Sequence, residues 1–305
     1  MNNNTVVAVV VTYNGKKWLG KCIGSLAKSI LPVHIIVVDN GSSDGSVEYL
    51  HTNFPSIEII ETGHNLGFGQ ANNIGFRRAL ELDADFVFLL NQDAWIYDNT
   101  IQQLVEIASN DNQWGILSPI HLNASGSDFD YKFKEYIQPP YCSDFVSDNY
   151  FQRLKSVYQT SFVNAAAWLI PRHVIKRVGG FDPLFPHYGE DVDYIQRCIN
   201  KKLFIGICTN VKVHHDSKVQ LWSDIMWNEK RMITIYLSEI KDINSSFRSN
   251  LLIFLKRRWD ELTSNLIYRQ IKLFLFRFKL IFKIVFQLRK VTRARKLSQK
   301  EGAFL

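Results

Sequence analysis

The chain has 305 residues, of which 46% are hydrophobic, 21% charged and 13% aromatic. This composition has too much apolar content for a disordered chain and too much charge for an integral transporter. The net charge of +7 is unevenly spread. Residues 251–305 hold 14 Lys and Arg against 3 Asp and Glu, a balance of +11, whereas residues 1–250 hold 22 against 26, a balance of −4. The basic character therefore belongs to the last part of the chain.

The cysteines and the N-terminal segment indicate in which cellular compartment the protein is expected. Four cysteines are scattered without a C-x-x-C pair, which favours a reducing compartment over a disulfide framework. They are Cys22, Cys142, Cys198 and Cys208. The segment MNNNTVVAVVVTYN has neither a basic leader nor a small-residue cleavage site, so it does not resemble a signal peptide. No uninterrupted apolar run is long enough to predict a spanning helix, and we expect a cytoplasmic protein.

The first part of the chain alternates predicted strands and helices. Continuous β-branched or apolar runs at 5–12, 33–39 and 86–91 predict strands buried on both faces of a parallel sheet. A shorter strand is predicted at 57–60. Helical patterns follow the first strand, follow the glycine-rich segment through about Leu82, and begin again near Asp98-Asn99-Thr100, which offers capping side chains. Short connections indicate right-handed βαβ units in a doubly wound sheet.

The second part of the chain is less regular at first. Residues 119–160 are rich in Ser, Asp, Tyr and Pro, and we expect a long surface excursion there. Ordered patterns return at 161–171, followed by a short helix and by two strand-like runs, LFIGIC and NVKVH. From about residue 225 the pattern is helical to the end. The expected fold class is α/β, a Rossmann-like mixed sheet with helices on both faces, plus a basic amphipathic helical region at the C-terminus.

Polar groups follow three of the predicted strands, in the segments Thr12-Tyr13-Asn14, Asp39-Asn40-Gly41 and Asn91-Gln92-Asp93. Taken singly, Asp39 could be a turn residue and Asp93 a helix cap. Ligands of open α/β sheets bind outside the carboxyl ends of the strands. The coincidence of three polar strand ends therefore indicates a binding site.

Six motifs occur in order along residues 5–217: VVVTYNG, IVVDNGSSDGS, NLGFGQANNIGFRRAL, LLNQDA, GGFDPLFPHYGEDVDYIQR and VKVHHDS. In this order they resemble the family 2 glycosyltransferases with a GT-A fold, and most of all the bacterial rhamnosyltransferase-type members. The resemblance implies a catalytic domain at 1–245, with a donor-nucleotide half at about 1–115 and an acceptor half at about 116–225. Residues 246–305 remain as the basic amphipathic helical region.

The resemblance implies an inverting transfer of a sugar from a nucleotide-diphosphate donor to a hydroxyl of a glycan acceptor. Rhamnose is the first candidate sugar, and UDP-GlcNAc, UDP-Gal or UDP-Glc are alternative donors. The implied acceptor is lipid-linked and the implied process is bacterial surface polysaccharide synthesis. The implied donor-binding residues are Thr12, Tyr13, Asn14, Asp39, Asn40, Asn65, Gly67, Asn72, Asn73, Asn91, Gln92 and Asp93. Among them, the carboxylate of Asp39 would accept a hydrogen bond from the N–H of a pyrimidine ring.

The resemblance also implies a divalent metal, Mg²⁺ or Mn²⁺. Asn91-Gln92-Asp93 takes the place of the family's D-x-D-like motif, usually N-P-D in this branch, so Gln92 is a departure. Asp93 is the implied ligand, and the metal would keep waters and share the phosphates of the substrate. A histidine after the last strand commonly completes the site. Adjacent strand residues face opposite sides, so at most one of His214 and His215 points inward. The motif favours His215, with His214 as the alternative, and a surface histidine pair stays open.

The carboxylates of Gly189-Glu190-Asp191 are the candidates for proton transfer. Inverting transfer requires the acceptor hydroxyl to lose its proton as it attacks the sugar. The resemblance implies Asp191 as this base, with Glu190 and Tyr188 as acceptor-binding or orienting residues. Acidic residues at a helix start can equally stabilise the helix dipole. Asp191 and Asp193 lie about 200° apart on a helix, and Asp193 is expected to be structural.

The basic tail at 269–296 predicts a surface helix. On one continuous helix its lysines at 272, 279, 283 and 290 fall within about 40° of one another, and most of the remaining surface is apolar. A cationic stripe beside a wide apolar face favours a helix lying on an anionic membrane surface, on the inner face of the cell membrane. Packing on the catalytic domain or on another subunit is the alternative. The oligomeric state stays open, and no nucleic-acid partner is expected because no recognised module accompanies the charge.

Two other function classes deserve comparison with the transferase. A nucleotidyltransferase that makes nucleotide-sugars would need a glycine-rich, Arg-containing phosphate loop after the first strand, and TYNGKKW does not supply one. A non-catalytic sugar-nucleotide-binding scaffold would not need to retain Asp39, Asp93, Asp191 and a candidate histidine together. The sequence therefore favours the enzyme.

Overall fold

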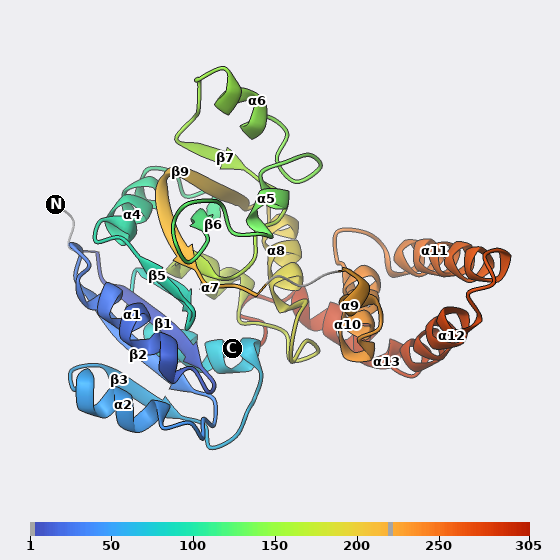
Figure 1. Ribbon diagram of the computed structural model, residues 1–305, viewed down its shortest axis with the longest axis horizontal. Coiled ribbons are helices and arrows are strands. Elements are labelled where there is room, and N and C mark those ends of the chain that lie inside the picture. Colours follow the sequence, from blue (N-terminus) through green and yellow to red (C-terminus); the bar gives the residue numbers. More distant parts are fainter. Residues whose placement is uncertain (1–3, 219–221) are drawn as a thin grey trace.

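The apolar runs of the sequence form a mixed sheet with helices on both faces (Figure 1). The computed structural model describes residues 4–218 and 222–305. Within this part of the chain the strand order is β3-β2-β1-β4-β8-β6-β9-β5, and β7 pairs with β9. The strands are β1 Val6–Thr12, β2 Val33–Asp39, β3 Glu58–Glu61, β4 Phe86–Asn91, β5 Ala94–Ile96, β6 Trp114–Leu122, β7 Val157–Gln159, β8 Ala167–Pro171 and β9 Phe204–His215.

The first strands form the parallel part of the sheet. β1 pairs in parallel with β2 on one side and with β4 on the other, and β3 continues beyond β2. Most of their side chains are fully buried, because helices cover both faces, and this explains the apolar runs without alternation. The strands predicted at 5–12, 33–39, 57–60 and 86–91 are confirmed. The parallel arrangement brings Thr12, Asp39 and Asn91 to one edge of the sheet.

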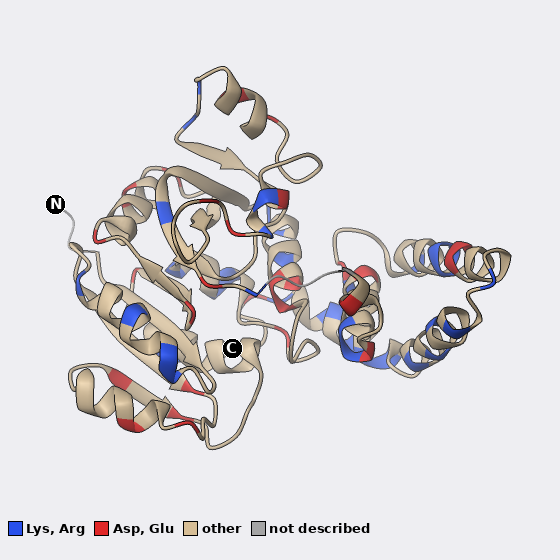
Figure 2. Ribbon diagram, in the orientation of Figure 1, with Lys and Arg blue, Asp and Glu red and all other residues tan. Residues whose placement is uncertain are grey.

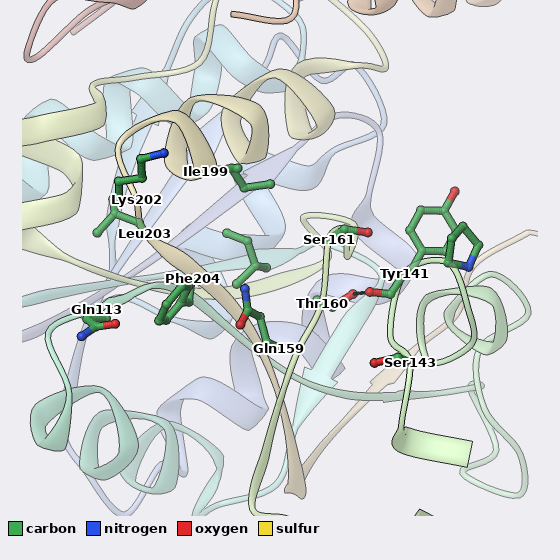
Figure 3. Close-up of a pocket in the computed structure, with 12 residues that line it drawn as sticks. Gln113, Tyr141, Ser143, Gln159, Thr160, Ser161, Ile199, Lys202, Leu203 and Phe204 are labelled. Carbon is green, nitrogen blue, oxygen red and sulfur yellow. Dashed lines mark hydrogen bonds between the residues drawn. The ribbon is translucent and has the colours of Figure 1, made fainter. Parts of the chain in front are cut away.

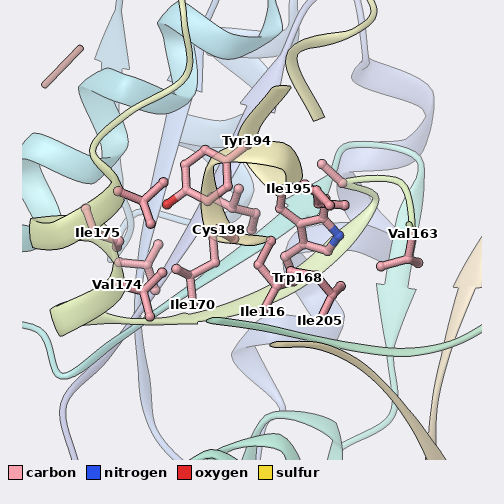
Figure 4. Close-up of a cluster of buried hydrophobic side chains, with 14 of the residues drawn as sticks. Ile116, Val163, Trp168, Ile170, Val174, Ile175, Tyr194, Ile195, Cys198 and Ile205 are labelled. Carbon is pink, nitrogen blue, oxygen red and sulfur yellow. The ribbon is translucent and has the colours of Figure 1, made fainter. Parts of the chain in front are cut away.

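The helices of the first three-quarters of the chain form two layers. α1 (Lys16–Ala27), α2 (Ser46–Asn53) and α4 (Thr100–Asn110) contribute to the apolar core on one face. The opposite core receives α3 (Phe68–Glu81), α7 (Arg172–Val178) and α8 (Glu190–Asn200). Trp168 of β8 and Tyr194 of α8 pack in this second core, with ring centroids 6.0 Å apart (Figure 4). Trp168 is therefore a core residue.

The second half of the sheet differs from expectation in two places. β6 spans residues 114–122, so the segment expected to be an irregular excursion begins inside a buried strand. The excursion itself carries α5 (Phe133–Tyr136), α6 (Phe145–Tyr150) and β7. The runs LFIGIC and NVKVH form one strand, β9, rather than two. A register shift against β6, between the pairs Pro119–Cys208 and Ile120–Lys212, accounts for the polar break between the runs.

The C-terminal region is helical but is not one continuous tail helix. Its helices are α9 Trp222–Met226, α10 Glu229–Lys241, α11 Phe247–Ile267, α12 Ile271–Val285 and α13 Leu288–Ser298. The break between α12 and α13 removes the single helix face on which Lys290 was aligned with Lys272, so that prediction was wrong. α10 lies before the expected boundary at residue 245, yet it packs in one apolar cluster with α11, α12 and α13. The helical region therefore includes α10.

The last residues of the chain return to the helical layer that covers the sheet. The backbone carbonyl of Ala303 accepts a hydrogen bond from the N–H of Gly180 at 2.7 Å. The carbonyl of Phe304 accepts one from Asn73 of α3 at 3.2 Å, and its ring lies 5.2 Å from the guanidinium of Arg197 in α8. The C-terminal end is thus a packing element of the sheet's helical layer.

Candidate functional site

A polar pocket of about 250 Å³ lies at the carboxyl edge of the parallel strands. The residues that line it are Val11, Tyr13, Asn40, Asn65, Phe68, Asn91, Gln92, Asp93 and His187. Six of these nine belong to the set expected to bind a donor, and they come from loops that follow β1, β2, β3 and β4. The pocket is therefore where the predicted strand-end residues meet.

The side chain of Gln92 ties two of these loops together. Its Oε1 accepts hydrogen bonds from the Thr12 hydroxyl at 2.8 Å and from the Tyr13 N–H at 2.9 Å. Its Nε2 donates to the Tyr13 carbonyl at 3.4 Å. Thr12 is fully buried, so the structure gives it a role in holding this turn. The departure from N-P-D thus supplies a cross-link between the ends of β1 and β4 that a proline could not make.

Asp39 has one oxygen engaged and one free at the end of β2. Its Oδ2 accepts hydrogen bonds from the backbone N–H groups of Gly41 and Ser42, at 3.1 and 3.0 Å. Its Oδ1 is buried and has no hydrogen-bond partner among the described residues. A buried carboxylate oxygen without a partner is costly, so it fits a ligand N–H donor. Asn14 is instead occupied, because its Oδ1 accepts from the N–H of Ser43 at 2.9 Å.

The glycine-rich loop is held by two asparagines. Asn40 donates to the Oδ1 of Asn65 at 3.1 Å and accepts from the N–H of Leu66 at 2.8 Å. At Gly67, with φ of +85°, an added Cβ would lie 2.0 Å from the carbonyl oxygen of Pro186. Gly67 therefore allows the segment before α8 to pack directly over the loop, which brings His187 into the pocket.

The two asparagines of α3 lie outside the pocket lining. Asn72 donates to the carbonyl of Phe68 at 3.0 Å, within its own helix. Asn73 donates to the carbonyls of Phe181 and Phe304 and accepts from the N–H of Phe181 at 2.6 Å. These backbone groups engage both polar atoms of the Asn73 carboxamide, and Asn73 is not among the residues that line the pocket. Asn73 joins α3 to the segment that precedes α8.

Asp93 and His215 are neighbours, because β5 pairs with the end of β9. His215 Nε2 lies 3.5 Å from Asp93 Oδ1, and His215 Nδ1 lies 3.3 Å from an oxygen of the buried Asp130. Burial alone would lower the pKa of His215, but Asp130 and Asp93 raise it to about 9. His214 faces the other way, with its ring stacked on Trp95 at 5.2 Å. Of the two histidines, His215 is the one beside Asp93.

The Asp93–His215 pair fits a divalent cation. Metal-binding histidines commonly hold their second nitrogen against a carboxylate, the position that Asp130 occupies here. Within residues 4–218 and 222–305, no three His, Cys, Asp or Glu side chains form a complete metal cage. Two protein ligands suit Mg²⁺ or Mn²⁺, since such ions retain waters and bind substrate phosphates.

Glu190 and Asp191 begin α8 directly after the segment that lines the pocket. Burial, and then the charge of Asp191, raise the pKa of Glu190 to about 8. Burial also raises the pKa of Asp191, and the positive charges of Lys132 and Arg231 oppose that rise. The guanidinium of Arg231 lies 4.3 Å from the ring centroid of the half-exposed Tyr188. The start of α8 thus combines a buried acid, Glu190, and a partly buried one, Asp191, with two nearby cations.

Asp193 is fully buried and points into the protein. Its carboxylate pairs with Arg197 of α8 at 2.8 Å and with Lys241 of α10. Lys241 also lies 3.0 Å from Asp182. The structural role predicted for Asp193 agrees with these contacts, which fasten the helix that carries Asp191.

A larger open groove of about 830 Å³ lies away from this site (Figure 3). Its walls are the start of β9 at Phe204, the end of α8 at Ile199 and the segments around Tyr141 and Gln159. It lies toward the opposite end of β9 from His215, and no carboxylate or histidine lines it. The groove lacks the groups for metal binding or proton abstraction, so the smaller pocket is the candidate site.

The mixed sheet with its carboxyl-edge pocket has the fold of the GT-A glycosyltransferases. More narrowly, the chain belongs to glycosyl transferase family 2, whose model matches residues 7–179. The predicted fold class and family are thereby confirmed, and the nucleotidyltransferase and scaffold alternatives fall away.

Two curated proteins similar to this chain are named as rhamnosyltransferases. The chain is 28% identical over 206 residues to N-acetylglucosaminyl-diphospho-decaprenol L-rhamnosyltransferase of Mycobacterium tuberculosis, covering 61% of this chain and 67% of that protein. It is 26% identical over 221 residues to dTDP-rhamnosyl transferase RfbF of Shigella flexneri, covering 70% and 69%. Among solved structures, mannosyltransferase PcManGT of Pyrobaculum calidifontis has the same fold, with a TM-score of 0.59 at 14% identity, covering 96% of this chain and 86% of that one.

Four residues of the site region were missed by the sequence analysis: Lys132, Asp130, His187 and Arg231. Asp130 and Lys132 come from the irregular excursion, where Asp130 accepts hydrogen bonds at the start of the four-residue helix α5. So short a helix leaves no periodic pattern in the sequence. Arg231 comes from α10, far along the chain, and only tertiary packing brings it to Tyr188.

Proposed function

We propose that this enzyme is an inverting rhamnosyltransferase that transfers a sugar from a nucleotide-diphosphate donor, dTDP-rhamnose first, to a hydroxyl of a lipid-linked glycan. The observation that carries the proposal is the pocket at the carboxyl edge, flanked by the Asp93–His215 pair and by the acids of α8. Both curated relatives are rhamnosyltransferases by name, and one takes a diphospho-decaprenol acceptor. These relatives support the donor and acceptor classes for this chain.

The donor would lie across the ends of β1, β2 and β4. The free Oδ1 of Asp39 offers an acceptor for the N–H of a pyrimidine ring. Tyr13, Asn40, Asn65 and Asn91 would surround the nucleotide from the loops. Because Gln92 already fixes the first loop, the pocket is preorganised before the donor binds.

Asp93 and His215 would hold Mg²⁺ or Mn²⁺ beside the diphosphate. When bound, the metal neutralises the negative charge that grows on the leaving nucleoside diphosphate. Asp130 would keep the imidazole of His215 oriented. Lys132 and Arg231 add positive charge at the acceptor side.

Asp191 would act as the general base. It would take the proton of the acceptor hydroxyl as that oxygen attacks the anomeric carbon from the side opposite the departing diphosphate, which inverts the configuration. Glu190, whose raised pKa keeps it neutral near pH 7, can donate a hydrogen bond to the acceptor. Tyr188 and Arg231 would border the acceptor.

The proposed setting is the inner face of the cell membrane, in bacterial surface polysaccharide synthesis. The charge balance of +11 over residues 251–305 supports a location at an anionic surface. The enzyme would then meet a soluble donor on one side and a membrane-held acceptor on the other.

The test is a screen of dTDP-, UDP- and GDP-sugars by thermal shift, followed by measurement of nucleoside diphosphate release with Mg²⁺, with Mn²⁺ and with chelator. We expect dTDP-rhamnose to raise the Tm most, because a ligand bound only to the native state stabilises it. Release should depend on the metal and on Asp93. Stronger stabilisation and turnover with a UDP-sugar would replace the rhamnose assignment, and metal-independent release would contradict the role of Asp93.

A further inference from the structure

Two helices of the C-terminal region expose large apolar side chains in regular stripes. On α11 the exposed residues recur at three-, four- and seven-residue spacing, and on α12 they recur at three and four. The residues are Leu252, Leu255, Trp259 and Leu266 on α11, and Ile271, Leu275, Phe278, Phe282 and Val285 on α12, continued by Phe286. Each is at least 47% exposed. These spacings place each set on one face of its helix.

The exposed stripes are not a core that failed to form, because the opposite faces of the same helices are packed. Phe254 of α11 contacts Tyr236 of α10 at a ring distance of 5.4 Å. Leu280 and Ile284 of α12 are buried in the same cluster. The outward faces therefore remain after the helical region has buried its own core.

Two of the lysines that the sequence predicts to face lipid headgroups form ion pairs within the protein. Lys279 lies 2.9 Å from Glu229 of α10, and Lys283 pairs with the same carboxylate. These two lysines hold α12 against α10. The surface that remains for a partner is instead the apolar face of α12, together with that of α11.

The charges beside the two apolar faces are mostly positive. Lys256 lies next to the stripe of α11, and Lys272 lies next to that of α12; both are exposed. Figure 2 shows Lys and Arg recurring along α11, α12 and α13. Of the two acids in α11, Glu261 is paired with Arg258 at 2.9 Å. A second copy of this chain would bring like charges together, whereas anionic lipid complements them.

The hairpin of α11 and α12 extends away from the sheet (Figure 1). Ile267 ends α11 and Tyr268 follows it in the turn, and both are among the most exposed apolar residues of the described chain. Among the described helices, none is long and apolar enough to cross a bilayer. A helix that is too short or too polar to span a bilayer, and that has an exposed apolar face flanked by cations, typically lies in the headgroup layer.

We propose that the α11–α12 hairpin binds anionic lipid bilayers by laying the apolar faces of both helices into the headgroup layer, with Lys256 and Lys272 on the lipid phosphates. This inference rests on the membrane-held acceptor proposed above and names the surface that reaches it. It replaces the single lysine stripe with two apolar helix faces, of which that of α12 is rich in aromatic residues.

The test is flotation of the full-length protein with vesicles of phosphatidylglycerol and phosphatidylcholine in equal parts, and with phosphatidylcholine alone. The variant Phe278→Ser/Phe282→Ser should bind the anionic vesicles at least about tenfold more weakly, because it removes two aromatic side chains that the bilayer would otherwise bury. The matched control is Tyr150→Ser/Phe151→Ser, which removes two exposed aromatic residues from the α6 region and should bind as the unmodified protein does.

A second variant tests the charges without altering the apolar faces. Lys256→Gln/Lys272→Gln should weaken binding to the anionic vesicles and reduce its salt dependence. Equal flotation of the unmodified protein and both hairpin variants would overturn the proposal. A dimer in sedimentation velocity that the Phe278→Ser/Phe282→Ser change dissociates, without vesicle binding by the unmodified protein, would also overturn it and assign the face to a second copy.

The closing measurement separates this inference from the proposed activity. Nucleoside diphosphate release in vesicle-free buffer should be the same for the unmodified protein and for Phe278→Ser/Phe282→Ser. Absence of release from every donor would count against the transferase proposal while leaving the flotation result valid. Normal release without flotation would count against the hairpin alone.

Discussion

The acids at the start of α8 make the sharpest residue-scale prediction. Asp191→Asn keeps the size of the side chain but removes the proposed base, so transfer should fall on the order of 10²–10⁴-fold. Donor binding, followed by thermal shift with the nucleotide, should change little because Asp191 is not among the residues that line the carboxyl-edge pocket. Turnover within a factor of about two of the unmodified enzyme would contradict the assignment.

Glu190 gives a pH-dependent prediction of stability. Its pKa rises from 4.5 to about 8 in the folded protein, through burial and then through Asp191. The folded state therefore holds a proton that the unfolded chain loses above pH 4.5, and stability falls as pH rises toward about 8. Glu190→Gln should flatten the decline of Tm across this window. Identical Tm slopes for the two proteins would show that Glu190 is not the titrating group.

Some residues of the site can be predicted from the sequence, and others need the structure. Strand-end residues such as Asp39 and Asp93 follow continuous apolar runs, so the sequence predicts both their strands and their shared edge. The structure distinguishes His214 from His215 through the pairing of β5 with β9. β5 has only three residues, so the sequence carries no pattern that predicts it. The use of Asn73 in packing could not be predicted either, because its partners lie in segments more than 100 residues away in sequence.

At the scale of elements, buried ion pairs hold α8 against α10. Lys241 is fully buried between Asp193 and Asp182. Lys241→Met would leave two carboxylates facing each other without their shared cation, and should lower the free energy of unfolding by about 3–5 kcal/mol. Urea denaturation measures this loss. A change below about 1 kcal/mol would mean that Arg197 alone satisfies Asp193.

The helices and strands also show which elements a sequence pattern can predict and which it cannot. The buried strands and the longer helices of the sheet were predicted because their periodicity is undisturbed. The sequence predicts two strands in place of β9 because a polar step interrupts the apolar pattern at the register shift. It predicts a single tail helix because residues 286–287 carry no glycine or proline to mark the break, which the packing of α12 and α13 on α10 imposes.

At the scale of the whole molecule, the C-terminal helices are part of the folded body. Deleting residues 251–305 would remove Phe254, Leu280, Ile284 and Val291 from the cluster around α10. At about 1.5–3 kcal/mol for each buried side chain, the loss rivals the 5–15 kcal/mol that stabilises a typical domain. We expect the truncated chain to be unfolded or aggregated by circular dichroism and gel filtration. A truncated chain with an unchanged Tm would show that the helices form a separate unit.

The ladder between β5 and β9 has a consequence for recombining this enzyme with its relatives. Ala94 pairs with His215, and the N–H of Asp216 donates to the carbonyl of Asp93 at 2.9 Å. Sheet register, set across more than 100 residues of sequence, therefore fixes the spacing of the carboxylate and the imidazole. A chimera joined near residue 115 would inherit one partner from each parent. Such hybrids should keep Asp93 beside His215 only where β5 of one parent pairs with the end of β9 of the other in the same register.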